Sequence, residues 1–237
     1  MPAGELRFGV QVDPKRYLTS WQTNYSKLRV VIREAQRFGF LGPGPASFHI
    51  GHSSGFVEQI RQVTKLANQD IALDIADLGS GGGVPGLVVA WSLSSANITL
   101  IEAGSRRSAF LLEASSFLGL SNLRVVTGRA ENIGRDPDFR GKFDVVMARS
   151  FGPPSATAEC SVALISKQGF VVVSEPPHSS KNEESRERWP AKELEELGLT
   201  PEWPNSSRYH FVLLKPDREC PTQYPRRNGV PFKKPLY

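Results

Sequence analysis

A glycine-rich segment at residues 77–86 has the spacing of a ligand-binding loop. It reads DLGSGGGVPG, and it follows a predicted strand and opens a predicted helix. Gly81, Gly83 and Gly86 match the GxGxxG pattern, whose glycines let the backbone approach a ligand. In open α/β sheets such a loop lies at the carboxyl edge of the strands, where ligands bind. The segment therefore predicts a binding site.

Two acidic residues near the loop bear on which ligand it binds. Asp77 lies two residues before the first glycine of the segment. A carboxylate there would repel a pyrophosphate and attract the ammonium group of S-adenosylmethionine, which carries no phosphate. Glu102 ends the next predicted strand and can accept hydrogen bonds from both ribose hydroxyls of either ligand. We expect S-adenosylmethionine rather than NAD; the alternative is that Asp77 caps a helix and the glycines form an ordinary tight turn.

Other reactive side chains form no comparable pattern. Cys160 and Cys220 lie far apart without neighbouring metal ligands, and Cys160 falls in a predicted helix, where a core position is expected. His49 and His52 are three residues apart but lack a third ligand nearby, so no metal site is predicted. The sequence also lacks an obvious acid/base dyad.

The elements that must position this loop alternate between strands and helices. Short apolar runs predict strands at residues 71–78, 98–102, 123–127, 143–148, 170–174 and 209–214. Helical spacing predicts N-terminal helices at 21–38 and 56–67, separated by a break at 38–44. Pro85, Ser105, Gly119 and Pro153 or Pro154 suit the ends of the intervening helices. Residues 182–197 predict a solvated helix that Pro190 interrupts.

Composition and charge limit the class of protein. The chain has 237 residues, 39% hydrophobic and 22% charged, which excludes wholesale disorder. It shows neither an export signal nor an apolar run of roughly 20 residues, so we expect a cytoplasmic protein without a membrane span.

The surplus of positive charge lies at the two ends of the chain. Residues 1–37 hold seven basic and three acidic residues, and residues 215–237 hold six basic and two acidic ones. The formal net charge is +5, so the part between them carries −3. Such ends suit a phosphate backbone, and Tyr224, Phe232 and Tyr237 could stack on bases. The alternative, which stays open, is a tail packed on its own domain with solvated charges.

Five segments resemble the bacterial RsmG/GidB family. They are residues 77–86 (DLGSGGGVPG), 100–111 (LIEAGSRRSAFL), 128–131 (GRAE), 143–150 (FDVVMARS) and 224–236 (YPRRNGVPFKKPL), and the likeness covers roughly residues 49–237. The resemblance implies a class I, Rossmann-like α/β methyltransferase with a mostly parallel seven-stranded sheet, helices on both faces, an antiparallel last strand and a helical N-terminal region. It implies methylation of guanine N7 in small-subunit (16S) ribosomal RNA, with S-adenosylhomocysteine as product and RNA or a ribosomal particle as partner.

The resemblance also implies site residues. Besides Asp77, Gly81, Gly83 and Glu102, the donor site would include Gly79, Val84, Ala130, Glu131 and Arg149, with Arg149 also positioning the reactants. Candidate RNA contacts are His49, which matches the family's histidine at the cleft mouth, and Arg226, Arg227, Lys233 and Lys234 of the tail. The corresponding division is a helical region at 1–70, a donor-binding domain at 71–215 and a basic tail at 216–237. The oligomeric state stays open.

Three residues depart from the family pattern. Phe48 and His52 stand where the family has a basic and an acidic residue, and Glu175 stands where it usually has Lys-Gly. They keep two alternatives open: a methyltransferase of the same scaffold that acts on another nucleic acid or a small molecule, and a non-catalytic RNA-binding assembly factor. Since guanine N7 has a lone pair, its methylation needs no general base, in agreement with the missing acid/base dyad.

Overall fold

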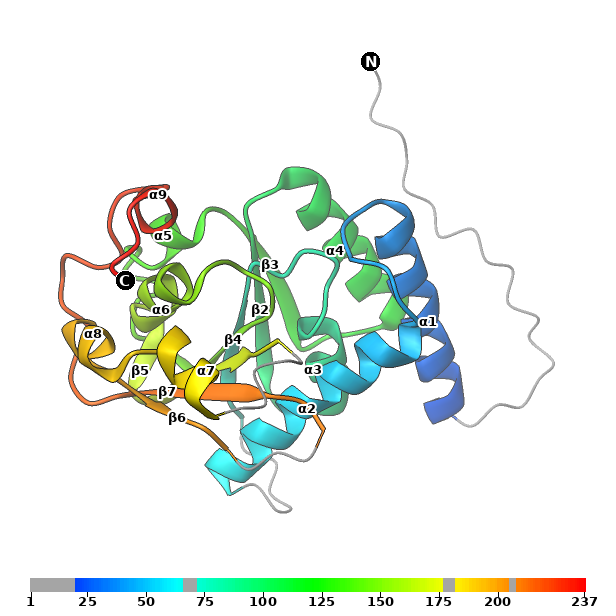
Figure 1. Cartoon of the computed structure of the whole chain (residues 1–237). Helices are drawn as coiled ribbons and strands as arrows, with labels where there is room; N and C mark the ends of the chain where they lie inside the picture. The colour runs from blue at the N-terminus through cyan, green and yellow to red at the C-terminus, as the bar shows by residue number, and fades with distance from the viewer. Residues whose placement is uncertain (1–19, 66–71, 177–181, 205–207) are drawn as a thin grey trace.

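A seven-stranded sheet forms the centre of the protein, and helices cover both of its faces (Figure 1). The computed structural model describes residues 20–65, 72–176, 182–204 and 208–237. The strand order is β3-β2-β1-β4-β5-β7-β6; the first five strands in this order are parallel, β7 is antiparallel to β5 and β6 is antiparallel to β7. The strands are β1 Asp74–Leu78, β2 Asn97–Glu102, β3 Leu123–Thr127, β4 Phe143–Ala148, β5 Ile165–Ser174, β6 Leu199–Glu202 and β7 Phe211–Pro216.

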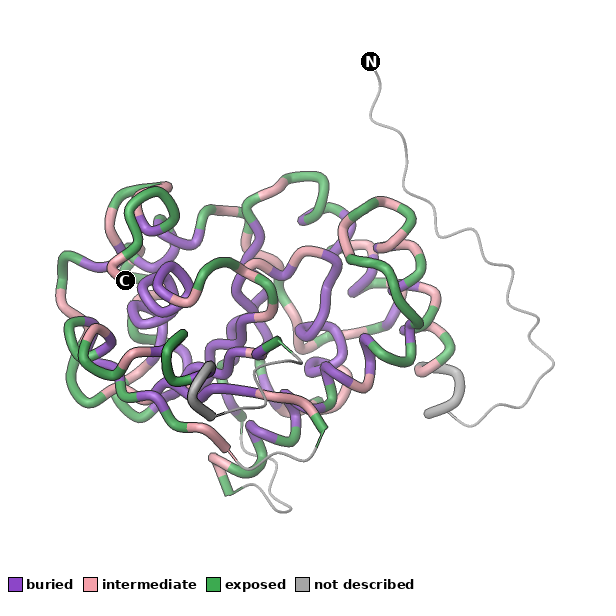
Figure 2. The backbone as a smooth tube through the Cα atoms, in the orientation of Figure 1, coloured by how far each residue is buried: buried purple, intermediate pink, exposed green. Residues whose placement is uncertain are grey.

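The helices divide between two cores, one on each face of the sheet. The helices are α1 Ser20–Arg37, α2 Ala46–Thr64, α3 Gly86–Ser92, α4 Ser105–Leu118, α5 Ala130–Ile133, α6 Pro154–Val162, α7 Asn182–Arg188, α8 Ala191–Glu196 and α9 Val230–Lys233. Residues of α1 to α4 share one core with Ile75 and Val145, whereas residues of α5, α6 and α8 share the other with Ala76 and Val146. Alternate residues of each strand thus face opposite cores, and the centre of the sheet is buried throughout (Figure 2).

Most of the predicted elements are present. The strands expected at 123–127 and 143–148 match β3 and β4, and the seven-stranded sheet with its antiparallel last strand is confirmed. Gly119 ends α4 with a φ of 70°, and Pro190 lies between α7 and α8, where the charged side chains from Arg186 onward are largely exposed. The expected extensions to Ile71 and Ala67 lie outside the described residues.

Several predicted boundaries were wrong. β5 begins at Ile165 instead of residue 170, β7 at Phe211 instead of 209, and Gly104 rather than Ser105 is the N-cap of α4. The strand β6 was not expected, because its four residues include Pro201 and it lies at the edge of the sheet, where proline costs no ladder hydrogen bond.

The second helix begins ten residues earlier than expected. Its first half lacks the apolar spacing of a surface helix because two glycines bring it against β7. A Cβ on Gly51 would lie 2.9 Å from the Tyr209 hydroxyl oxygen, and one on Gly55 would lie 2.9 Å from Phe211 Cζ. Close approach of the backbone thus replaces side-chain packing here, and it brings His49 and His52 onto a buried helix face.

Candidate functional site

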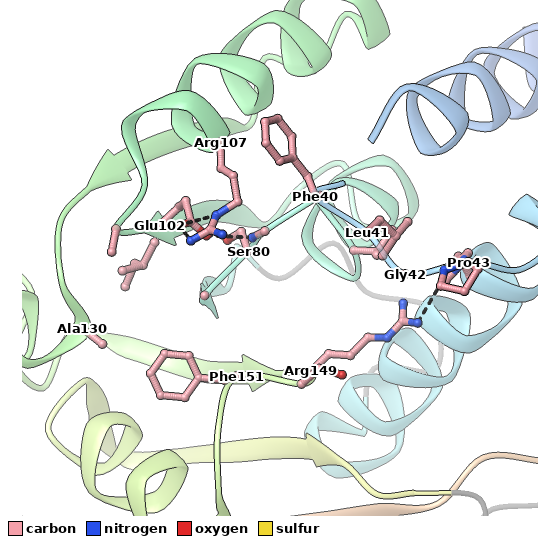
Figure 3. A pocket seen from close by; sticks show the side chains of 18 of the residues that line it. Phe40, Leu41, Gly42, Pro43, Ser80, Glu102, Arg107, Ala130, Arg149 and Phe151 are labelled. Carbon is pink, nitrogen blue, oxygen red and sulfur yellow. Dashed lines mark hydrogen bonds and ion pairs between the residues drawn. The ribbon is translucent and has the colours of Figure 1, made fainter. Parts of the chain in front are cut away.

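A cavity of about 610 Å³ opens at the carboxyl ends of β1, β2 and β4. We call it the donor cavity. Figure 3 shows Glu102 and Arg107 on one side of it and Arg149 and Phe151 on the opposite side. Seven residues expected from the sequence line it: His49, Gly79, Gly81, Val84, Glu102, Ala130 and Arg149. The structure therefore brings together most of the predicted donor site, and His49, which was expected to contact RNA, lines the same cavity.

Glu102 is held rigidly at the end of β2. Its side chain is 3% exposed, Oε2 accepts a hydrogen bond from the Gly81 amide at 2.9 Å, and Oε1 accepts one from the Gly104 amide at 2.7 Å. Arg107, at the start of α4, adds a hydrogen bond from Nε to Oε1 at 2.8 Å. The carboxylate thus ties the glycine loop to the next loop, and its charge at the cavity wall is paired with Arg107, which also lines the cavity.

The glycine loop has backbone geometry that side chains would disturb. Gly79 has a φ of 71°, and a Cβ there would lie 2.6 Å from Phe151 Cδ2. Gly83 has a φ of 89° and does not line the cavity; a Cβ there would clash with the Leu87 side chain of α3. Gly79 therefore leaves room at the cavity, whereas Gly83 allows the loop to pack on α3.

Asp77 lies beneath the loop rather than on the cavity wall. It is 1% exposed, and its Oδ2 accepts a hydrogen bond from the Gly86 amide at 3.0 Å, at the first turn of α3. This is the helix-capping arrangement that the sequence left as an alternative. Burial raises the pKa of Asp77 to about 7, so near neutral pH a small change in pH or in nearby charge alters the fraction of Asp77 that is ionised.

Neighbouring residues after β3 have separate roles. Ala130 lines the donor cavity, but Glu131 does not. The Glu131 side chain is 1% exposed and accepts hydrogen bonds on Oε1 from Arg129 Nη2 at 2.7 Å and from the Gly229 amide at 2.6 Å. Burial raises the pKa of Glu131, but these hydrogen bonds outweigh burial and hold the pKa below its ordinary value. Glu131 therefore joins the C-terminal tail to the cavity wall instead of facing the cavity.

Arg149 and His49 meet across the opening between β4 and α2. Arg149 Nη2 lies 3.0 Å from His49 Nδ1, and burial followed by the charge of Arg149 lowers the pKa of His49. Arg149 Nη1 is buried and has no hydrogen-bond partner among the described residues. A buried guanidinium N–H group without a partner can donate a hydrogen bond to an anionic ligand.

Sequence reasoning missed the loop between α1 and α2 as part of the site. Phe40, Leu41, Gly42 and Pro43 line the donor cavity, and Phe40 packs edge-to-face on Phe110 of α4. The only signal was the break at residues 38–44, which marked a turn without indicating where the turn folds. Arg107 and Phe151 were also missed, although Arg107 is five residues from Glu102 at a helix start.

A second cavity of about 540 Å³ adjoins the first. It shares Phe48, Arg149, Ser150 and Phe151 with the donor cavity and extends to the ends of β5 and β7. His52 and Glu175 line it, so all three residues that depart from the family pattern meet here. Burial, with a smaller contribution from Arg149, lowers the pKa of His52 to about 4, which leaves its ring neutral at pH 7.

The basic tail is partly packed and partly exposed. Arg226 forms an ion pair with Glu159, which is fully buried, with 2.6 Å between Nη2 and Oε2. Arg227, Lys233 and Lys234 are exposed. The structure thus uses Arg226 for packing, as in the alternative interpretation of the tail, and leaves the other three charges on the surface.

The part of the chain that the structure describes holds neither a cluster of metal ligands nor a helix that could span a membrane. No group of three histidine, cysteine or acidic residues there could hold a metal ion. No described helix combines the length and the apolar character that crossing a membrane requires.

Comparison with known proteins relates this geometry to a family. Residues 54–200 match the model of GidB, described as rRNA small subunit methyltransferase G. The chain is 33% identical over 176 residues to the ribosomal RNA small subunit methyltransferase G of Prochlorococcus marinus (strain NATL2A), covering 73% of this chain and 71% of that protein. It is 30% identical over 185 residues to the protein of the same name from Lactococcus lactis subsp. lactis (strain IL1403), covering 76% and 77%.

A solved structure supports the fold. The putative O-methyltransferase from Klebsiella pneumoniae superposes with a TM-score of 0.57 at 14% identity, over 81% of this chain and 90% of that one. This likeness confirms the class I methyltransferase fold that the sequence predicted. With the family match over residues 54–200 and the relatives above, the chain belongs to the GidB family of rRNA small subunit methyltransferases.

Proposed function

We propose that this protein transfers a methyl group from S-adenosylmethionine to N7 of a guanine in small-subunit ribosomal RNA, in the cytoplasm. Membership of the family supports the reaction and the RNA. The observation that carries the donor assignment is the pair of binding groups on opposite sides of the donor cavity: the Glu102 carboxylate, paired with Arg107, on one side and the Arg149 guanidinium on the other.

The donor cavity fits the parts of S-adenosylmethionine. Among the described residues, Oε2 of Glu102 accepts a single hydrogen bond, from Gly81, so it can accept another from a ribose hydroxyl. Nη1 of Arg149 can pair with the carboxylate of the methionine part. Val84 and Ala130 supply apolar contact for the adenine. Glu102 could bind the ribose of either ligand, but the pyrophosphate of a dinucleotide would lie over buried Asp77, which is unfavourable when Asp77 is ionised.

The chemistry needs positioning more than proton transfer. The lone pair of guanine N7 forms a bond to the methyl carbon as the carbon–sulfur bond breaks, which leaves S-adenosylhomocysteine and a cationic purine. No proton is removed, so the protein needs no general base. Holding the two reactants in line supplies much of the rate acceleration. Arg149 and Phe151 lie on the wall that both cavities share and are placed to do this.

The test uses the purified protein and methyl-labelled donor. Small-subunit RNA from cells that lack this protein should acquire label as 7-methylguanosine, identified by mass spectrometry of the digested nucleosides. Label in another nucleoside would show a different acceptor, and label confined to small metabolites of a cell extract would show a small-molecule enzyme. RNA binding without any transfer would favour an assembly factor. Calorimetric titration with S-adenosylmethionine and with NAD tests the donor separately.

A further inference from the structure

Among the described residues that line the second cavity, one side chain is acidic, and it is almost fully buried. Glu175 follows β5, is 6% exposed, and lines the cavity together with Arg188 and Trp189. The remaining walls include the rings of Phe48, Phe151 and Tyr209. A chamber with aromatic walls and a small number of charged groups suits a planar, polar heterocycle.

Residues of α7 and the turn after it orient the Glu175 carboxylate. Its Oε2 accepts hydrogen bonds from Ser185 Oγ and from Arg188 Nε, both at 3.2 Å. Its Oε1 accepts one from Trp189 Nε1 at 2.9 Å. Among the described residues, Oε1 has no other hydrogen-bond donor, so it retains one acceptor position. Arg188 uses Nε here, and within the described part of the chain its terminal N–H groups are left for a further contact.

We propose that the second cavity is the chamber for the acceptor base, and that Glu175 selects guanine in it by accepting a hydrogen bond from the Watson–Crick edge. This inference rests on the proposed function, because it names the substrate contact of the same reaction. The shared wall of Arg149 and Phe151 places the chamber directly beside the donor cavity, as methyl transfer requires.

The chemistry of the chamber matches guanine and opposes adenine. Guanine presents N–H donors at N1 and N2, which suit the carboxylate, and an acceptor at O6, which suits Arg188. Adenine presents a lone pair at N1, which Glu175 would repel, and an amino group at the position of O6. Holding guanine by its Watson–Crick edge leaves N7, on its other edge, free to be methylated.

Three hydrogen bonds fix the orientation of the Glu175 carboxylate, which a flexible surface side chain would lack. The three donors belong to Ser185, Arg188 and Trp189. Arg188 and Trp189 lie three and four residues after Ser185, so all three are on one side of α7 and of the residue that follows it. The negative charge that departs from the family pattern is therefore an oriented group inside the chamber, and not an exposed anion near the RNA backbone.

The test compares guanosine with adenosine at one position. Once the methylated nucleotide is mapped, an RNA fragment is transcribed with guanosine there and a second one with adenosine. Wild-type protein should methylate the guanosine fragment at least about 100-fold faster, because a site built for hydrogen bonding rejects the wrong pattern strongly. Glu175→Gln should reduce this ratio to within about tenfold, since its amide can donate to adenine N1.

Ser185→Ala is the matched control variant. It removes a hydrogen bond from the same carboxylate but keeps the charge, so it should retain the wild-type ratio even if both rates fall. If Glu175→Gln lowers both rates equally and keeps the ratio, Glu175 has only a structural role and the inference is overturned. Failure of the wild-type protein to methylate either fragment would instead count against the proposed function.

A measurement on wild-type protein avoids dependence on folding of the variant. An RNA fragment with 1-methylguanosine at the mapped position leaves N7 free but removes the N1 hydrogen-bond donor and adds bulk at that edge. We expect its methylation to be at least about 100-fold slower. Methylation at the unmodified rate would show that the Watson–Crick edge is not recognised and would overturn the proposal.

Discussion

Arg226→Gln should destabilise the protein strongly, although Arg226 lies in a tail that could be taken for a flexible RNA-binding segment. Glu159, on α6, is fully buried, and the Arg226 side chain is 26% exposed. Arg226 donates from Nε to both carboxylate oxygens at 2.9 and 3.1 Å, and from Nη2 at 2.6 Å. Removing the guanidinium would leave a buried carboxylate with the Arg226 backbone amide as its remaining described donor.

The magnitude follows from the cost of an unpaired buried charge. Breaking such a pair from one side typically costs about 3–5 kcal/mol. For a chain of this length, that corresponds to a fall in Tm of about 6–20 °C. Arg227→Gln should change the free energy of unfolding by less than about 0.5 kcal/mol, because Arg227 is exposed.

Thermal and urea unfolding, followed by circular dichroism, measure both variants. Replacing both partners, as in Arg226→Met with Glu159→Leu, should recover most of the lost stability, since no buried charge remains unpaired. If Arg226→Gln unfolds at the temperature of the Arg227→Gln protein, the ion pair does not hold the tail, and the assignment of Arg226 to packing is refuted.

Three further predictions concern the donor and the RNA. Glu102→Gln should weaken binding of S-adenosylmethionine about 10- to 150-fold in calorimetry through loss of a charge-assisted hydrogen bond, and unchanged affinity in the folded variant would contradict our donor site. Changing Arg227, Lys233 and Lys234 to Gln should leave donor binding intact and make the log-log salt slope of RNA binding shallower by about 0.7 per lost phosphate contact; an unaltered slope would mean that these charges face only solvent. Burial raises the pKa of Asp77 to about 7, so an ammonium group should bind more tightly as pH rises through 7 and this carboxyl ionises. Affinity for S-adenosylhomocysteine should therefore rise from pH 6 to 8 in wild type and less in Asp77→Asn, and parallel pH profiles would show that the charge of Asp77 does not reach the ligand.

The donor cavity could be predicted from the sequence because its main parts are local. The glycine loop follows β1 and Glu102 ends β2, and parallel strands bring their carboxyl ends to one edge of the sheet. We did not predict which face of the sheet the Asp77 side chain points to, although the alternation of side chains along a strand determines it. Asp77 lies two residues after Ile75, so both side chains point to the face that α3 covers. Its carboxylate therefore meets the start of α3 before it can reach the cavity.

Contacts between distant segments could not be predicted in this way. Two adjacent arginines in the tail look alike in sequence, yet only Arg226 meets Glu159, 67 residues earlier in the chain. The partners of Glu175 had a weak signal, because Ser185, Arg188 and Trp189 have the spacing of one helix side. That spacing indicates a shared face but not the residue that the face contacts.

The tail combines the two interpretations that its sequence left open. Phe232 packs edge-to-face on Phe151, which lines both cavities, and the Gly229 amide donates to Glu131, the neighbour of the cavity residue Ala130. These contacts fix α9 against the wall of the site. Its exposed charges, beginning with Lys233 next to Phe232, are therefore held near the cavities rather than on a free segment. Packing of the tail is what would allow its charges to bind an RNA backbone in a defined position relative to the donor.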